Sequence, residues 1–291
     1  MREEEILPEK RHRLFRAIWW GCNLLLIFSL IATVRAGVWE YTVRSYLAGF
    51  SDAIVEDSAS PREKVDAILA WMRNGPPRQE AKRPSELSLR DPTDTLNYRQ
   101  LLAVCGSATN AFLNLARSTG VETRRLLLLS PDRTAKHVVA EVNLDGRWVI
   151  ADPTYRTLMQ DARGNLLTRK DLQDPELFRE ATSRIPGYLQ MYSYESFAHV
   201  RVSAIPLHGL HLRQLLDRVF PGWDEHLDWS LLLERRSFMY LFLSIVALFS
   251  FLVLRLILGW LADQRLRVAR FHLRANLIRA TTAFFTTPEI K

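Results

Sequence analysis

The chain has 291 residues, a formal net charge of +7, 48% hydrophobic residues and only two cysteines. The apolar share excludes wholesale disorder, and two cysteines exclude a disulfide-rich scaffold and a four-thiolate zinc site. The surplus of Lys and Arg lies in residues 1–16 and 263–291 and at Arg35 and Arg255, beside two apolar runs. Because the rest of the chain is neutral, the charge pattern indicates a membrane and not a nucleic acid as the partner.

Two apolar runs are long enough to cross a lipid bilayer. Residues 17–34 and 237–254 are each free of charged side chains. We therefore expect transmembrane helices over residues 17–36 and 237–262. The alternative for the first run is a cleaved signal peptide, although the apolar core of a signal peptide usually spans only about 7–15 residues.

Basic residues flank both runs on the side of the chain ends. By the positive-inside rule, residues 1–16 form a cytoplasmic tail, and both termini lie in the cytoplasm. The chain between the spans then lies outside, as a folded domain over 37–206 and a juxtamembrane segment over 207–236. The tail over 263–291 places apolar residues on one helical stripe, which is typical of a helix on an anionic leaflet. Binding a cytoplasmic partner is the alternative for this tail.

Cys105 is the only cysteine of the expected outside domain. An unpaired thiol in an oxidising compartment is a liability unless it is buried or used, and a small buried apolar residue is the common alternative. Apolar residues recur after it at helical spacing, up to the capping Gly120. They are Ala108, Ala111, Phe112, Leu115 and Ala116. Cys105 therefore opens a predicted helix of about 14 residues, where free amides and the helix dipole favour a thiolate nucleophile.

Three strand-like runs follow this helix, and a two-residue turn signal, Asp145-Gly146, joins the last two. The three runs cover residues 122–130, 136–144 and 147–154. With that turn, His137 and Asp152 point to the same face as diagonal neighbours about 7–8 Å apart at Cα. An imidazole and a carboxylate can meet across that distance. Glu141 lies on the same face and is the alternative carboxylate.

A thiol, an imidazole and a carboxylate can together carry out acyl transfer. The imidazole takes the thiol proton, the carboxylate orients the ring, and the thiolate attacks an amide or ester carbonyl. The backbone N–H of Cys105 is a natural oxyanion donor at its helix end, and a second donor is expected upstream. Gln100 and Tyr98 are the candidates for that oxyanion or substrate site.

These blocks resemble the transglutaminase-like superfamily, a branch of the papain-like cysteine enzymes. The resemblance spans about residues 61–155 and starts with a lead-in helix over 61–73. Its blocks are Cys105 at a helix start, Gly120-Val121-x-x-Arg124, His137, Trp148 and Asp152-Pro153. The chain departs from the family at Ala103, where glycine is frequent, and at Val139, where an aromatic residue is frequent.

The resemblance implies an α+β fold in which a catalytic helix packs on an antiparallel sheet, here flanked by two transmembrane helices. It maps the catalytic triad onto Cys105, His137 and Asp152. It implies a membrane-anchored cysteine protease, amidase or acyltransferase that acts on a peptide or protein in the cell envelope, on the outer side of a bacterial cytoplasmic membrane. The alternative is a non-catalytic envelope module that binds peptides or assembles partners.

Residues 156–206 are expected to add further strands and loops that complete the domain. The chain has no phosphate-binding glycine motif, no Cys-x-x-Cys and no His-Glu-x-x-His, so we expect neither a cofactor nor a metal. His208, His211 and His226 give only a weak metal signal, because no carboxylate or thiolate accompanies them at a familiar spacing.

Overall fold

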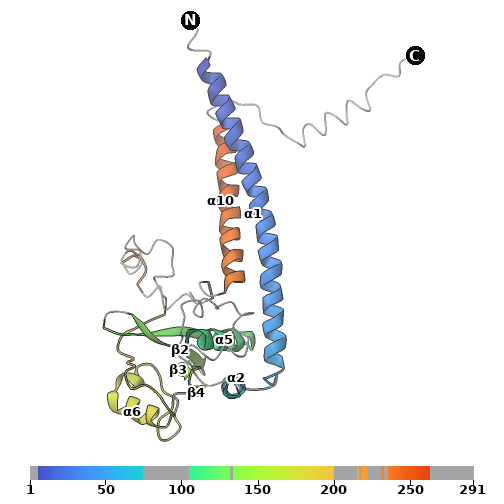
Figure 1. Cartoon of the computed structure of the whole chain (residues 1–291). Helices are drawn as coiled ribbons and strands as arrows, with labels where there is room; N and C mark the ends of the chain where they lie inside the picture. The colour runs from blue at the N-terminus through green and yellow to red at the C-terminus, as the bar shows by residue number, and fades with distance from the viewer. Residues whose placement is uncertain are drawn as a thin grey trace, which may run out of the picture. The chain divides into compact units, whose positions relative to one another are not determined.

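The computed structural model divides the chain into two compact units (Figure 1). The first unit joins Met1–Val34 with Leu243–Lys291, and the second is Arg35–Phe242. The structure describes residues 6–74, 105–131, 134–199, 215, 218–221, 231–232 and 235–262. The expected tail helix over 263–291 and most of the juxtamembrane segment over 207–236 lie outside the described residues, as do the three candidate metal-binding histidines.

The first unit contains most of two long helices, α1 (Ile6–Asp52) and α10 (Arg236–Leu261). Their mean hydropathy reaches 1.9 in α1 and 2.7 in α10, and only 11% and 6% of their most apolar stretches are buried. A core helix of a soluble domain would bury its apolar side chains, so this exposure favours lipid as the surroundings. Both helices are long and apolar enough to cross a membrane, which supports membrane association.

A small apolar cluster joins the two helices inside the first unit. It consists of Phe15, Cys22, Leu258 and Ala262, with Trp19 packed against it. The Cys22 thiol is buried and donates a hydrogen bond to the carbonyl oxygen of Phe251 at 3.5 Å. Cys22 therefore has a packing role between the helices, and Cys105 is the thiol of the second unit.

A buried ion pair links α1 to the start of α10 inside the second unit. Glu40 is 3% exposed and accepts a hydrogen bond from Ser237 Oγ at 2.7 Å. Arg235 Nη2 lies 3.0 Å from the other carboxylate oxygen, and Arg44 Nε lies 2.7 Å from the same oxygen. A buried carboxylate is tolerated only with such partners, so these contacts hold the two chain segments together at this point.

The lead-in helix has the predicted bounds, since α2 covers Pro61–Arg73. Ser60 and Glu63 form a reciprocal capping box at its start, and Pro61 occupies the first turn, where no amide partner is lost. Its buried residues recur at helical spacing and line one face. They are Val65, Ile68, Leu69 and Met72.

The helix predicted to begin at Cys105 is α5 (Cys105–Ser118), and Gly120 follows it with a positive φ of 81°. The next elements are β1 (Thr123–Leu129), β2 (Ala135–Leu144) and β3 (Arg147–Asp152), which confirm the three predicted strands. Two short strands, β4 (Thr157–Leu158) and β5 (Phe197–Ala198), complete an antiparallel sheet in the order β4-β3-β2-β1-β5. The fold is therefore the expected mixture of helices and antiparallel sheet, with α5 lying along the sheet (Figure 1).

The predicted hairpin register is confirmed. Ala140 pairs with Ala151 and Glu141 with Ile150 across β2 and β3. Asp145 and Gly146 form the turn with φ angles of 53° and 81°, and a turn with two left-handed residues matches the twist of the strands that it joins.

Each face of the sheet carries its own apolar layer. On one face, α2, α5 and the end of α1 pack on side chains such as Ala140 and Val142 of β2. On the other face, residues 155–197 cover side chains such as Val139 and Ile150. Side chains from β2 therefore reach both layers, and the odd-numbered ones, including that of His137, point toward the second layer.

The second layer contains a helix that the sequence analysis did not expect. Within the expected strands and loops of residues 156–206, α6 (Pro175–Ser183) forms after the 3-10 turn η2 (Asp171–Gln173). Its local signals are clear, because Asp174 caps two amides and Pro175 occupies the first helical turn. Phe178 and Ala181 face the core from this short helix.

The hairpin turn can be tested with two glycine substitutions that differ only in backbone conformation. A Cβ would meet no atom within 4 Å at Gly146 or at Gly49, but Gly146 has a φ of +81° whereas Gly49 lies within α1. We expect Gly146→Ala to lower the free energy of unfolding by about 1–2 kcal/mol and Gly49→Ala to raise it by about 0.5–1 kcal/mol. Thermal unfolding of the full chain in detergent measures both, and equal shifts would contradict this assignment of the turn.

Candidate active site

Cys105 is the first residue of α5, and its side chain is partly exposed. It packs against an apolar cluster from β1, β2 and β5 that includes Leu127 and Val138. One turn further along α5, Thr109 Oγ1 donates a hydrogen bond to the carbonyl oxygen of Val138 at 2.9 Å. Because Val138 is the chain neighbour of His137, this bond fixes the start of the helix beside the histidine strand.

His137 and Asp152 make the contact that the register predicts. The Nε2–H group of His137 donates to Oδ2 of Asp152 at 2.7 Å, and both residues are completely buried. Oδ1 of Asp152 accepts the backbone N–H groups of Thr154 at 3.0 Å and Tyr155 at 3.3 Å. The carboxylate is therefore held by the turn after β3, and it in turn fixes the orientation of the imidazole.

The thiol of Cys105 completes the arrangement. It lies within hydrogen-bonding reach of the His137 ring. Nε2 is occupied by Asp152, and Nδ1 is buried with no hydrogen-bond partner among the residues that the structure describes. Nδ1 is thus the ring nitrogen that remains for the sulfur, and the structure brings the three predicted residues together.

The surroundings of His137 favour its charged form. Burial by itself would lower the pKa of His137, but the charge and hydrogen bond of Asp152, together with those of Cys105, raise this pKa from 6.5 to about 9. The raised pKa favours the imidazolium form of the ring at neutral pH, and an imidazolium held by Asp152 next to Cys105 is the electrostatic setting that stabilises a thiolate.

Tyrosines surround this pair on the second face of the sheet. The rings of Tyr155, Tyr188 and Tyr192 all contact the His137 ring. Burial, with the nearby charge of Asp152, raises the pKa of Tyr188 well above the usual phenol value, so this hydroxyl stays neutral. The sequence analysis missed these residues, although four of the eight tyrosines of the chain lie between residues 155 and 194.

A buried arginine lies beneath the first turn of α5 and was also missed. Arg125 is 3% exposed, and its Nη2 donates to the carbonyl oxygen of Gly106 at 3.4 Å. Arg125 therefore places a positive charge next to the residue that follows Cys105. The sequence does carry a signal for this contact, because Arg125 lies next to a run of leucines in its strand. A buried arginine rarely lacks a partner, so its position predicts a polar contact.

Glu141, the alternative carboxylate for His137, has other partners. It accepts hydrogen bonds from Arg124 Nε at 2.6 Å and from His199 Nε2 at 2.9 Å. Burial opposes its ionisation, but these two partners lower the pKa of Glu141 below its usual value. Arg124 also lies 4.3 Å from the centre of the Trp148 ring. The family-like residues Arg124 and Trp148 thus belong to a structural network on β1, β2 and β3.

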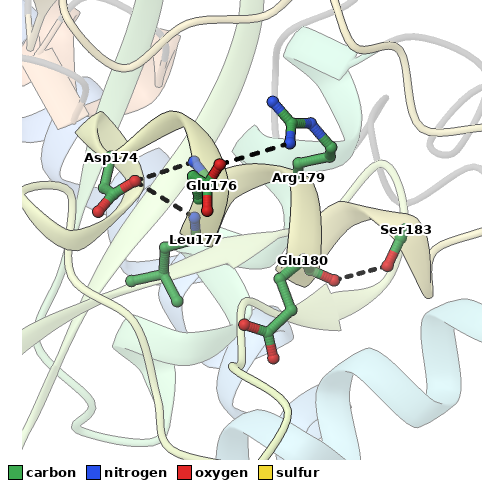
Figure 2. Close-up of a pocket in the computed structure, with 6 residues that line it drawn as sticks. All are labelled: Asp174, Glu176, Leu177, Arg179, Glu180 and Ser183. Carbon is green, nitrogen blue, oxygen red and sulfur yellow. Dashed lines mark hydrogen bonds and ion pairs between the residues drawn. The ribbon is translucent and has the colours of Figure 1, made fainter.

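The other predicted positions give no further contacts. Gln100 and Tyr98, the oxyanion or substrate-site candidates, lie outside the described residues. Among the described residues, no group of three His, Cys, Asp or Glu side chains could hold a metal ion. A surface hollow of about 570 Å³ lies on α6, but its lining contains none of the three site residues (Figure 2).

The raised pKa of His137 predicts a pH-dependent stability. A group with a pKa of about 9 when folded and 6.5 when unfolded stabilises the fold fully below pH 6.5, and this contribution is lost as the pH rises through 9. It amounts to about 3 kcal/mol. We expect the melting temperature of the wild-type chain to fall from pH 6 to pH 9.5.

Asp152→Asn is the matched control for this pH dependence, because it keeps the size of the side chain and removes the charge. Burial then acts with less opposition, so the pKa of His137 falls and most of the extra stability at low pH disappears. Parallel curves of melting temperature against pH for the two chains would show that the Asp152 charge does not raise this pKa.

Comparison with known proteins agrees with this geometry. Residues 48–153, which include Cys105, His137 and Asp152, match the family model described as the transglutaminase-like superfamily. The searches of curated proteins and of solved structures gave no match. The second unit of this chain therefore contains a transglutaminase-like domain, which the chain combines with two candidate membrane-spanning helices.

Proposed function

We propose that this chain is a membrane-anchored, transglutaminase-like cysteine enzyme that acts by thiolate acyl transfer on a peptide-like substrate in the cell envelope. The observation that carries the proposal is the buried Asp152–His137 pair, with the Cys105 thiol within reach of the ring. The partial exposure of Cys105 also supports it, because a nucleophile must meet its substrate while its base stays protected from water.

The proposed reaction needs only these three side chains and a substrate amide. The Cys105 sulfur, having given its proton to His137, attacks the carbonyl carbon and forms a C–S bond. The imidazolium returns that proton to the nitrogen of the leaving amine as the C–N bond breaks. Asp152 keeps the ring oriented and stabilises its charge in both steps. The product of this half-reaction is an acyl-thioester on Cys105 and a free amine.

A second nucleophile then resolves the thioester. Attack by water gives a carboxylic acid and completes hydrolysis, whereas attack by a bound amine gives a new amide and completes transamidation. In either case His137 takes a proton from the attacking group, and the thiolate leaves. The oxyanion of each step would accept a hydrogen bond from the backbone N–H of Cys105, and Gln100 and Tyr98 remain the candidates for a second donor.

The proposed location follows from the charges that flank the two long helices. Basic residues precede the first span and follow the second, as at Arg16 and Arg265, and the positive-inside rule therefore favours a cytoplasmic location for both termini. The transglutaminase-like domain between the spans would then act outside the cytoplasmic membrane. A peptide or protein of the envelope is the corresponding substrate class, and the lipid bilayer and other membrane proteins are the expected partners.

The first test is the pH dependence of Cys105 alkylation by iodoacetamide in the full chain. Cys22→Ala leaves Cys105 as the only thiol. We expect a reaction midpoint well below the free-thiol value of about 8.5, because the imidazolium stabilises the thiolate. His137→Ala should return the midpoint to about 8.5 or higher.

The matched control for this test is His199→Ala, which removes the other buried histidine that pairs with a carboxylate on this sheet. The variant should keep the low midpoint. If the chain with Cys22→Ala alone reacts with a midpoint near that of a free thiol, and His137→Ala does not change it, the result would support the non-catalytic module that binds peptides.

The orientation of the domain has a separate test. A membrane-impermeant maleimide applied to right-side-out vesicles should label Cys105 only if the domain lies outside.

The second test is capture of the acyl-enzyme. Membranes that contain the full chain are incubated with envelope peptides and denatured in acid, and the peptide that carries Cys105 is analysed by mass spectrometry. We expect an added acyl mass that hydroxylamine removes, because thioesters react with this nucleophile. The added mass should be absent from Cys105→Ala and His137→Ala and present in His199→Ala. Added mass that persists in His137→Ala would contradict the proposed role of the imidazole.

A further inference from the structure

The His137 ring lies flat against one aromatic ring. Its centroid is 4.2 Å from that of Tyr192, and the two planes are only 5° apart. His137 is completely buried and Tyr192 is 4% exposed. A near-parallel contact at this distance places the Tyr192 ring over one face of the imidazole, so Tyr192 shields that face from water and limits the rotation of the ring.

Two further tyrosines keep Tyr192 in this position. Tyr188 meets the Tyr192 ring edge-on at 5.7 Å, and Tyr155 packs on Tyr188 at 4.4 Å. Both also contact the His137 ring at steep angles, from Tyr155 at 5.9 Å and from Tyr188 at 6.4 Å. The segment that holds Tyr192 is therefore fitted around the histidine from several sides.

This segment is also tied to the carboxylate that orients the ring. The Tyr155 backbone N–H donates to Asp152 Oδ1, and the Tyr155 hydroxyl donates to the carbonyl oxygen of Gly187 at 3.2 Å. At the other end of the loop, the Tyr192 N–H donates to the carbonyl oxygen of Leu189 at 3.3 Å. Asp152 thus fixes the edge of the imidazole through its contact with Nε2. Through Tyr155, it also supports the loop that brings Tyr192 to the face of the His137 ring.

We propose that Tyr192 is a positioning residue that acts through His137, holding the imidazolium in the plane that directs Nδ1 toward Cys105 and stabilising its charge with the π face. The inference rests on the proposed thiolate chemistry and adds a residue outside the matched family segment. The face of an aromatic ring attracts a cation, and the attraction is largest in a site without water. This role belongs to the ring and not to the hydroxyl group, so Tyr192→Phe should keep the effect on Cys105.

The experiment is the pH profile of Cys105 alkylation by iodoacetamide in the full chain that carries Cys22→Ala. Tyr192→Leu keeps an apolar side chain over the ring but removes the π face, whereas Tyr192→Phe keeps that face. We expect Tyr192→Leu to raise the reaction midpoint by about one pH unit and Tyr192→Phe to leave it unchanged. The rise follows because a less stable imidazolium stabilises the thiolate less.

Phe178→Leu is the matched control, because Phe178 packs on Tyr188 and Tyr194 in the same aromatic layer and, among the described side chains, makes no ring contact with His137. It should lower the melting temperature and keep the midpoint. If the low midpoint depends on His137 but Tyr192→Leu leaves it in place, Tyr192 only packs and the inference is wrong. If the midpoint does not depend on His137 in the first place, the proposed function fails, and the two failures are therefore distinguishable.

Discussion

A single buried hydrogen bond, from His137 Nε2 to Asp152 Oδ2, organises the candidate site. Both residues are completely buried, and charges in such a place are tolerated only when each has partners. Asp152 has three, because two backbone amides occupy its second oxygen. Loss of either member would leave the other as an uncompensated charge or an unpaired polar group. The turn after β3, the orientation of the imidazole and the charge beside Cys105 all depend on this bond.

The pair depends in turn on the hairpin register. His137 and Asp152 belong to strands joined by Asp145 and Gly146, and a shift of one residue would place their side chains on opposite faces of the sheet. The geometry of the two-residue turn opposes such a shift. A two-residue turn near one end of the hairpin thus decides whether an acid–base pair exists at the other.

The two faces of the sheet have separate tasks. The face that carries α2 and α5 is apolar and holds α5 in place through packing and the Thr109 hydrogen bond. The opposite face contains the tyrosines and the buried carboxylates Asp152 and Glu141. Cys105, at the end of the helix, is the group that stays partly exposed. This division suits the proposed acyl transfer, in which Cys105 must be open to substrate while His137 remains shielded from water.

The sheet carries two buried histidine–carboxylate pairs, His137–Asp152 and His199–Glu141, and their neighbours differ. This difference distinguishes the candidate active-site pair from the structural pair. Glu141 shares its charge between His199 and Arg124, whose guanidinium also lies on Trp148. Among the described residues, His137 is the one ionisable side chain that forms a hydrogen bond with Asp152. The charge of the His137 ring can therefore act on Cys105. Electrostatic surroundings, and not the residue types themselves, thus distinguish the two pairs.

The sequence by itself determined the features that arise from local periodicity and local turn chemistry. These include the two long apolar helices, α2 with its Pro61 start, the helix that opens at Cys105, and the hairpin that places His137 diagonally across from Asp152. α6 also had a local signal in Asp174 and Pro175, although the expectation for that region was strands and loops. Only the tertiary structure decided that Tyr192 would lie on His137, that Arg125 would reach Gly106, and that His199 would pair with Glu141. The physical reason is that these contacts join residues separated by long stretches of chain, where no repeat or turn rule relates one position to the other, so the packing of the two layers selects the partners.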